Sequence, residues 1–334
     1  MAQIKQRTFI PFLLFLVLLT GCDPMAAQPT PAVIIITAVP SATPPPTATE
    51  AMTATPIPTL TPIITPSATQ PICDEANGQV IRMDQFLSSV ANENLRYWVY
   101  TPPCYQKTQK RYPVLVAIHG AAARENQWSE LGLLAAADEG FLSGVLPPMI
   151  IVMPYYGSIG NISTFPPDPS YETVVLDELI PAVDRDFCTW SDREHRAIGG
   201  ISRGGMWAYI IAMRHPDVFG IVGGHSAYMP DNLFEVPSDF NPLELANNST
   251  LLPDARLRMY IDNGAEDPSG NNLQLFSSRL TGRGINHTYV INPRGGHDEA
   301  YWSSHVGEYL AFYGRNWPRS ASELPSCLDP SPSA

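Results

Sequence analysis

The sequence predicts an α/β fold, in which a mostly parallel central sheet carries helices on both faces. Short apolar runs alternate along residues 73–334 with segments whose apolar side chains recur near the 3.6-residue period of a helix. A Gly-x-Ser-x-Gly sequence also lies where one of these runs gives way to a helical segment. Strands that alternate with helices imply right-handed crossovers, which place successive strands parallel in one sheet. We therefore expect one domain over residues 73–334.

The strands are expected in the apolar runs. The first two runs are early extended stretches, and the other six are short and apolar enough to be buried parallel strands. The expected strands are Val80–Met83, Leu95–Tyr100, Pro113–Ile118, Met149–Met153, Arg196–Gly200, Phe219–Gly223, Leu257–Ile261 and Thr288–Ile291. The longest helical pattern is Tyr171–Phe187, in which Val175, Leu179 and Val183 fall on one face. The other expected helices are Gly204–Arg214, Asn271–Gly282 and Glu299–Tyr313.

The N-terminus has the pattern of a secretion signal. A basic start precedes an apolar run, Phe9–Leu19, that is too short for an ordinary membrane-spanning helix. The run ends in LTGC at residues 19–22, which resembles the lipobox of bacterial lipoproteins. The resemblance implies that residues 1–21 are a signal peptide and that Cys22 is lipidated, which would anchor the protein at the extracellular face of the cell envelope. The alternative is a plain signal peptide followed by an incidental cysteine.

Residues 22–72 are expected to be a disordered linker. The stretch Asp23–Ile72 holds twelve prolines and eleven threonines, no glycine and only two charged residues. Such a chain cannot bury enough apolar surface to offset its ordering entropy, and it should have polyproline character. The linker would act as a stalk between a membrane and the domain.

The charge balance argues against nucleic-acid binding. The chain carries 20 Lys and Arg against 32 Asp and Glu, which gives a formal net charge of −12 at pH 7. Neutralising a phosphate backbone needs a basic face, so no nucleic-acid partner is expected. No Cys-x-x-Cys pair or Cys/His spacing indicates zinc, and no metal or cofactor is expected.

Four cysteines belong to the domain once Cys22 is set aside: Cys73, Cys104, Cys188 and Cys327. An even set in an exported domain suggests two disulfides, for which three connectivities are possible. We favour Cys73 with Cys104 and Cys188 with Cys327, because each bond would then tie one end of the domain to its body. Free buried thiols are the alternative.

The Gly-x-Ser-x-Gly sequence spans Gly200–Gly204 and centres on Ser202. A serine on the sharp turn between a strand and a helix projects its Oγ beyond the sheet, and the glycines leave room where strand and helix crowd together. In open α/β sheets ligands sit beyond the carboxyl ends of the strands. Ser202 is therefore the candidate nucleophile, and a glycine-rich turn with an incidental serine is the alternative.

His297 is the candidate base that takes the serine proton. It follows the last expected strand in a loop that neighbouring glycines leave open, and His225, which follows another expected strand end, is the rival. The imidazole needs a carboxylate to orient it, and the loop before the helix Asn271–Gly282 offers Asp262 and Asp267. Spacing alone does not separate these two. The order of serine, acid and histidine is the one expected of α/β-hydrolases.

Two backbone amides are expected to stabilise the oxyanion that forms in ester or amide chemistry. One is the N–H of Arg203, at the start of the helix after the serine. The other is the N–H of Ala121, in the small-residue loop after the first central strand, where the His119 side chain is expected to be structural. Three aromatic residues follow strand ends on the same side and could either line the pocket or belong to the core: Trp128, Tyr155 and Tyr156.

Together these segments resemble the esterase D-type family of α/β-hydrolases, which also includes feruloyl esterases and mycolyltransferases. The resemblance covers roughly residues 79–315 and implies an α/β-hydrolase fold with serine esterase chemistry. In the family the acid lies three residues after a loop glycine, which here leads from Gly264 to Asp267, and the second oxyanion donor follows a His-Gly pair, which implies Ala121. The segments that carry the resemblance are Tyr112–Gly120, Glu178–Asp184, Gly200–Gly204, His215–Gly220 and Gly295–His297.

The sequence thus predicts an exported, lipid-anchored serine esterase that hydrolyses a small-molecule, carbohydrate or lipid ester through Ser202, His297 and Asp267. An acyltransferase of the mycolyltransferase type would share the acyl-enzyme, so it remains an alternative. A surface binding module on a hydrolase scaffold, with its chemistry lost, is another. The proline-rich segment Tyr228–Pro253 is expected to form a cap or insertion over the site.

Overall fold

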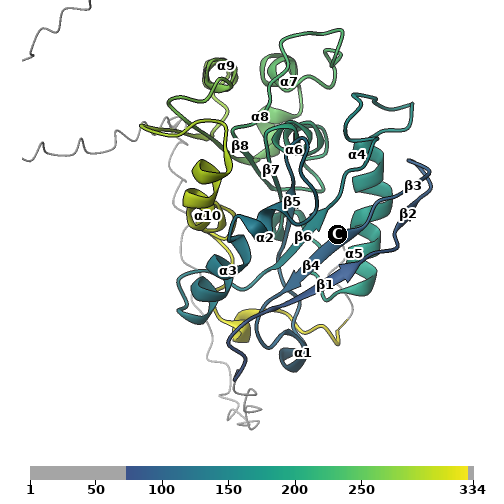
Figure 1. The fold of residues 1–334 in the computed structure, drawn as a ribbon, viewed down its shortest axis with the longest axis vertical. Coiled ribbons are helices and arrows are strands. Elements are labelled where there is room, and N and C mark those ends of the chain that lie inside the picture. The colour runs from purple at the N-terminus through teal and green to yellow at the C-terminus, as the bar shows by residue number, and fades with distance from the viewer. Residues whose placement is uncertain (1–72, 330–334) are drawn as a thin grey trace, which may run out of the picture. The chain divides into compact units, whose positions relative to one another are not determined.

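The structure, a computed structural model, describes residues 73–329. The expected signal peptide, Cys22 and the linker lie outside the described residues. The strands of the central sheet are β1 Gln79–Met83, β4 Tyr97–Thr101, β5 Val114–Ile118, β6 Ile150–Pro154, β7 Arg196–Ile201, β8 Ile221–His225, β9 Arg258–Gly264 and β10 Thr288–Asn292. They lie in the order β1-β4-β6-β5-β7-β8-β9-β10, of which Figure 1 labels the part from β1 to β8. Strand β4 is antiparallel to both of its neighbours, and the remaining pairs are parallel. Two short strands, β2 Leu87–Ser88 and β3 Glu93–Asn94, pair separately.

Helices cover both faces of the sheet. Helices α3 (Leu133–Leu142) and α10 (Glu299–Tyr313) bury their apolar residues against one face, and α5 (Ile180–Asp186), α6 (Arg203–Arg214) and α9 (Gly270–Gly282) against the other (Figure 1). The shorter helices are α1 Tyr105–Thr108, α2 Gln127–Glu130, α4 Tyr171–Thr173, α7 Pro242–Asn248 and α8 Leu252–Ala255, with a π-helical turn at Val174–Leu179 and 3₁₀ turns at Arg193–His195 and Ala321–Glu323.

The central strand β5 shows why the sheet needs helices on both sides. Its side chains alternate, so that Val114, Val116 and Ile118 belong to the core under α5, α6 and α9, whereas Leu115 and Ala117 belong to the core under α3 and α10. All five side chains are buried. A strand buried on both faces is continuously apolar, as this one is. The expected fold, an α/β-hydrolase sheet with helices on both faces, is confirmed.

Two strands differ from the expected boundaries in a way that matters for the site. Strand β8 lies two residues later than expected and ends on His225, because pairing with β7 and β9 holds Gly223 and Gly224 in the sheet despite their low strand propensity. Strand β9 runs on to Gly264, because β10 pairs with it that far. Asp262 therefore lies inside β9 and not in the loop after it.

The expected helix Tyr171–Phe187 is present from Tyr171 to Asp186, but it is not uniform. Its middle turn is π-helical and ends just before Pro181. Proline has no backbone N–H, so Pro181 cannot donate the hydrogen bond that an α-helix would make to the carbonyl four residues earlier. The sequence did not indicate α3 or α7. Helix α7 lies inside the segment expected to be a cap, where Asn241 caps it by accepting hydrogen bonds from the amides of the first turn.

Both ends of the described chain lie at the amino ends of the parallel strands, opposite Ser202. The C-terminal end is placed there by the bridge between Ser326 and Lys110, ahead of β5. The register places the N-terminal end, because Tyr97 of β4 pairs with Pro154 at the carboxyl end of β6. The other end of β4, Thr101, pairs with Gln79 at the start of β1. The chain therefore enters the sheet at the pole farthest from the carboxyl ends of the strands.

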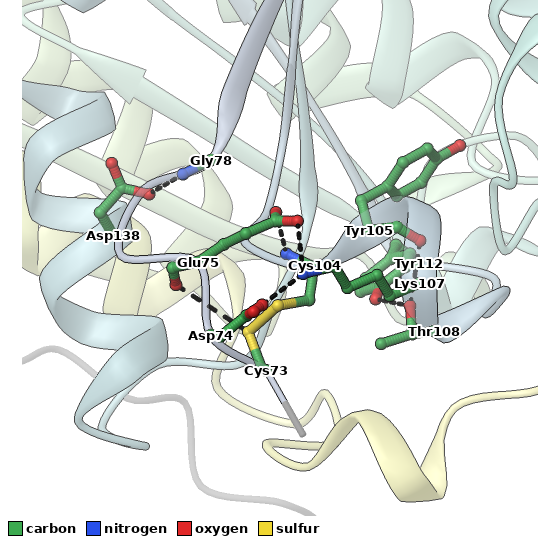
Figure 2. Close-up of a disulfide and its surroundings, with 10 residues drawn as sticks. All are labelled: Cys73, Asp74, Glu75, Gly78, Cys104, Tyr105, Lys107, Thr108, Tyr112 and Asp138. Atoms are coloured by element: carbon green, nitrogen blue, oxygen red, sulfur yellow. Dashed lines mark hydrogen bonds and ion pairs between the residues drawn. A yellow bond between two sulfur atoms is a disulfide. The ribbon is translucent and has the colours of Figure 1, made fainter. Parts of the chain in front are cut away.

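Two disulfides fasten the chain at this pole. Cys73 is bonded to Cys104, and Cys188 to Cys327, so the favoured connectivity is confirmed. Figure 2 shows the first bond, just ahead of β1, where the Glu75 carboxylate accepts a hydrogen bond of 2.7 Å from the Cys104 amide. The bond joins the residues just before β1 to those just after its partner β4, and so closes that strand pair covalently.

Candidate active site

Ser202 stands on the turn between β7 and α6. Its backbone angles, φ 52° and ψ −117°, form the strained turn that projects the hydroxyl from the sheet. Its amide donates a hydrogen bond of 3.0 Å to the carbonyl of His225 on the next strand. A Cβ on Gly200 would lie 2.3 Å from the carbonyl carbon of Gly204, and a Cβ on Gly204 would lie 2.4 Å from the carbonyl oxygen of His119. The turn therefore requires both glycines of the motif.

His297 faces Ser202 from the loop between β10 and α10. Its Nε2 lies 2.9 Å from the serine Oγ, and its Nδ1 lies 3.1 and 3.3 Å from the two carboxylate oxygens of Asp267. An ionised carboxylate only accepts hydrogen bonds, so Nδ1 carries the imidazole hydrogen. This leaves the lone pair of Nε2 aimed at the serine hydroxyl, where it can take up the proton.

The Asp267 carboxylate is fully buried, and its surroundings favour the ionised form. Burial by itself would raise its pKa. Hydrogen bonds from His297, the Ser226 hydroxyl and the Ser269 amide outweigh burial, and together they lower the pKa of Asp267 below its ordinary value. The carboxylate is therefore charged at neutral pH and can stabilise an imidazolium on His297.

The loop after β5 is fixed by neutral buried groups. The Gly120 amide donates to Oε1 of Gln127 at 2.8 Å, and the Gly120 carbonyl accepts from the Tyr156 hydroxyl at 3.2 Å and from Nδ1 of His119 at 2.7 Å. The other ring nitrogen of His119 accepts from the Tyr156 amide at 3.3 Å. Burial lowers the pKa of His119 to about 4, so its ring is neutral near pH 7. Both polar atoms of the Gly120 backbone are thus held in place.

The two amides expected to bind an oxyanion lie beside the serine. Arg203 is the first residue of α6, where backbone N–H groups have no acceptor within the helix. Ala121 follows the fixed loop and lines the same cavity as Ser202 and His297. The Arg203 side chain turns away from the cavity, and its Nε donates to the carbonyl of Gly160 at 2.8 Å. Its amide is therefore the group available to a substrate.

A cavity of about 590 Å³ opens beside Ser202. One wall is the loop after β5 with α2, and the other is the start of α10. The lining is more polar than a lipid-binding pocket would be, since it includes one arginine and two glutamates. The lining residues are Gly120, Ala121, Ala122, Ala123, Arg124, Asn126, Gln127, Glu130, Ser202, His297, Glu299 and Trp302.

The three aromatic residues considered for the pocket belong instead to the support behind it. Trp128 is 2% exposed, and its indole N–H donates to the carbonyl of Ile118 at 3.1 Å. Tyr156 stacks on the ring of His119 with centroids 3.9 Å apart, and Tyr155 is half-buried near the same ring. The pocket interpretation was wrong for Trp128 and Tyr156, which turn back into the core once the strands end. Tyr155 does not line the cavity either, and its ring lies under the side chains of Arg96 and Arg124.

His225, the rival base, is buried away from the serine hydroxyl. Its Nδ1 lies 2.8 Å from a carboxylate oxygen of Asp262, and its Nε2 lies 2.9 Å from the Tyr313 hydroxyl. Two further tyrosine hydroxyls donate to the same carboxylate. Both ring nitrogens are therefore occupied on the α10 side of the sheet. The carboxylate that reaches the imidazole of His297 is Asp267.

Three residues that touch the site were not singled out from the sequence: Gln127, Ser226 and Trp302. Gln127 accepts the hydrogen bond from the Gly120 amide that fixes the loop after β5, called the oxyanion loop below. Trp302 lies edge-on to the His297 ring, with centroids 5.2 Å apart. Ser226 is a buried residue with a positive φ of 49° at the end of β8. The one available signal was the position of Trp302, which lies within the first two turns of the helix that His297 precedes.

Comparison with known proteins agrees with this geometry. A family model described as "Putative esterase" matches residues 88–313, which is more than half of the chain and includes Ser202, Asp267 and His297. The chain belongs to this esterase family. The chain is 36% identical over 149 residues to an endo-1,4-beta-xylanase/feruloyl esterase of Xylanibacter ruminicola, a match that covers 40% of this chain and 20% of that protein. It is 29% identical over 146 residues to an esterase of Mycobacterium tuberculosis, covering 42% and 31%.

Solved structures support the fold assignment. A ferulic acid esterase matches with a TM-score of 0.64 and 28% identity, and the match covers 72% of this chain and 98% of that one. The S-formylglutathione hydrolase of Staphylococcus aureus matches with a TM-score of 0.61 and 19% identity, covering 71% and 98%. The chain spans less than a third of the length of the curated relatives described above, which are longer proteins.

Proposed function

We propose that this protein is a serine esterase that hydrolyses carboxylic esters through Ser202, His297 and Asp267. The observation that carries the proposal is the unbroken chain of contacts from the buried Asp267 carboxylate through His297 to the hydroxyl of Ser202. Family membership supports the same chemistry. A binding module that had lost its chemistry would have no need of a buried carboxylate aligned with an imidazole and a strained serine.

In the proposed reaction, His297 Nε2 removes the proton of Ser202 as Oγ attacks the ester carbonyl carbon. The carbonyl electrons move to oxygen, and the Arg203 and Ala121 amides stabilise the resulting oxyanion. The C–O bond to the alcohol then breaks, and the imidazolium protonates the leaving oxygen. Water attacks the acyl-enzyme with His297 again as base, which releases the acid and restores Ser202.

We propose hydroxycinnamate esters, such as ferulate esters, as the first substrates to test. The relative from Xylanibacter ruminicola and the solved ferulic acid esterase carry that activity in their names. The polar cavity beside Ser202 suits a hydroxyl-bearing alcohol better than a long acyl chain. The acyltransferase alternative differs only in the nucleophile that resolves the acyl-enzyme, so products formed with added alcohols distinguish the two.

We also propose that the esterase is exported and anchored to the bacterial membrane through lipidated Cys22. The disulfides are consistent with an oxidising compartment outside the cytoplasm. Among residues 73–329, no helix is long and apolar enough to cross a membrane. Incorporation of labelled palmitate, lost in Cys22→Ser, tests the anchor.

The activity is tested with a fluorophosphonate probe, which labels only an activated serine. We expect mass spectrometry to find the label on Ser202, and hydrolysis of p-nitrophenyl acetate and methyl ferulate to fall by roughly 10⁶-fold in Ser202→Ala. Ser278→Ala, at an exposed serine of α9 whose hydroxyl donates only to the Gln274 carbonyl of its own helix, is the control that should keep activity. Folded protein that neither reacts with the probe nor hydrolyses either ester would refute the esterase proposal.

A further inference from the structure

Trp302 contacts both His297 of the candidate triad and Ser226, the residue that follows β8. It lies on α10, four residues after Asp298, whose side chain caps that helix, and it is only 6% exposed. Its ring stands nearly perpendicular to the His297 imidazole, at an interplanar angle of 84° with centroids 5.2 Å apart. Its indole N–H donates a hydrogen bond of 3.0 Å to Oγ of Ser226. The indole therefore has a fixed orientation against the imidazole.

The direction of this hydrogen bond determines what the Ser226 hydroxyl does. An indole nitrogen is a donor only, so Ser226 Oγ must accept from Trp302 and direct its own hydrogen elsewhere. The Ser226 hydroxyl is one of the groups that lower the pKa of Asp267, so it faces that carboxylate. A carboxylate accepts and does not donate, so the Ser226 hydroxyl is the partner that can direct its hydrogen toward Asp267. Successive hydrogen bonds of this kind strengthen one another in a buried site.

The backbone at Ser226 is strained and is held in place by its neighbours. Its φ of 49° lies in the left-handed region that non-glycine residues seldom adopt, and the residue is completely buried. Its amide donates to the carbonyl of Asp262 at 2.9 Å, which ties the turn to β9. Strained backbone persists only where the surrounding contacts offset its energetic cost, and such positions cluster at functional sites.

We propose that Trp302 and Ser226 are positioning residues of the esterase: the Trp302 ring lies edge-on to the His297 imidazole, and its N–H holds the Ser226 hydroxyl that faces the Asp267 carboxylate. This inference rests on the proposed function. Trp302 acts on both ends of the Asp267–His297 pair, because its ring limits the tilt of the imidazole while its N–H sets the Ser226 hydroxyl. These contacts keep the carboxylate aligned with Nδ1 as charge develops on the imidazole.

The test removes the two donors separately and together. Trp302→Phe keeps an aromatic ring against His297 but loses the N–H, and Ser226→Ala loses the hydroxyl. For each, we expect kcat on p-nitrophenyl acetate to fall roughly five- to ten-fold with KM unchanged, as for the loss of one hydrogen bond. The double variant should be no slower than the slower single variant, because both changes break the same set of contacts.

Trp317→Phe is the matched control. Trp317 is also buried, at 4% exposed, and its indole N–H donates to the carbonyl of Glu194 at 2.8 Å, at the opposite pole of the sheet. Its replacement removes the same kind of donor, so any loss of stability should match that of Trp302→Phe while kcat is kept. If Trp317→Phe and Trp302→Phe lower kcat equally, or if the losses of the two site variants multiply, the positioning role is refuted.

A second measurement does not depend on turnover. The hydrogen on Nδ1 of His297 should give a far-downfield proton resonance in the wild type, because it is held by a buried carboxylate. We expect the resonance to shift or to broaden by exchange in Ser226→Ala and Trp302→Phe, and to be kept in Trp317→Phe. An unchanged resonance in both site variants would overturn the inference. If the wild type is inactive, the esterase proposal fails, and this resonance still decides whether Ser226 and Trp302 position the pair.

Discussion

At the carboxyl ends of the parallel strands the molecule is held by hydrogen bonds between buried side chains, whereas at the amino ends it is held by two disulfides. The first pole contains strained backbone at Ser202 and Ser226. The amides of both serines donate hydrogen bonds to carbonyls of neighbouring strands, and the Ser226 hydroxyl accepts one from the indole of Trp302. The second contains two covalent bonds and an Arg196–Asp184 ion pair at 2.5 Å.

The difference follows from what each pole has to do. A hydrogen-bonded network can hold atoms in the geometry that proton transfer needs, because each donor and acceptor has a preferred direction. A disulfide acts chiefly on the unfolded chain, whose freedom it restricts, and contributes little to the alignment of distant groups. Changes at the first pole should therefore alter rate, and changes at the second should alter stability.

The largest expected effect compares the two carboxylates of the β9 region. Asp267→Asn should lower kcat by about 10⁴-fold, because an amide no longer fixes the Nδ1–H tautomer of His297. Asp262→Asn should mainly destabilise the fold, since the buried carboxylate accepts hydrogen bonds from two tyrosine hydroxyls and lies against His225. Steady-state kinetics and thermal unfolding of both variants make the comparison. Similar losses of kcat in the two folded variants would contradict our assignment of the acid.

The second effect is thermodynamic and belongs to the opposite pole. Replacing Cys73 and Cys104 by serine opens a loop with a sequence separation of 31, and should lower the free energy of unfolding by about 3–4 kcal/mol. Activity per folded molecule should be unchanged, because the bond lies at the far end of the sheet from Ser202. Guanidinium unfolding and active-site titration measure the two quantities. A fall in kcat of the folded variant would mean that the poles are coupled.

The sequence predicted those parts of the site that depend on local chain geometry. The glycines around Ser202 are required by the elbow itself, and His297 lies in a loop kept open by adjacent glycines, so both positions are visible in the residues. A mostly parallel sheet with helices on both faces could be expected because the strands alternate with helices, but the order of the strands could not. The choice of Asp267 over Asp262 came from the family resemblance, because spacing alone could not show that β10 extends β9 past Asp262.

What could not be predicted depends on contacts between distant segments. Tyr156 and Trp128 follow strand ends, as pocket residues often do, but whether such a ring turns outward or packs under the oxyanion loop depends on the side chains it meets. Gln127 and Ser226 carry no pattern of their own. Their partners, Gly120 and Trp302, are brought to them only by the assembled sheet.

The smallest expected effect concerns pH and stability at the catalytic pole. Because burial lowers the pKa of His119 to about 4, the unfolded chain binds a proton there near pH 6.5 while the folded chain does not. His119 should therefore make the fold less stable as pH falls from 6.5 toward 4, by about 1 kcal/mol at pH 5.5. Urea unfolding at pH 7.5 and 5.5 should show that extra loss in the wild type and not in His119→Gln. An equal pH dependence in the two proteins would mean that His119 is protonated when folded, and that the Gly120 carbonyl and the Tyr156 amide do not hold its neutral form.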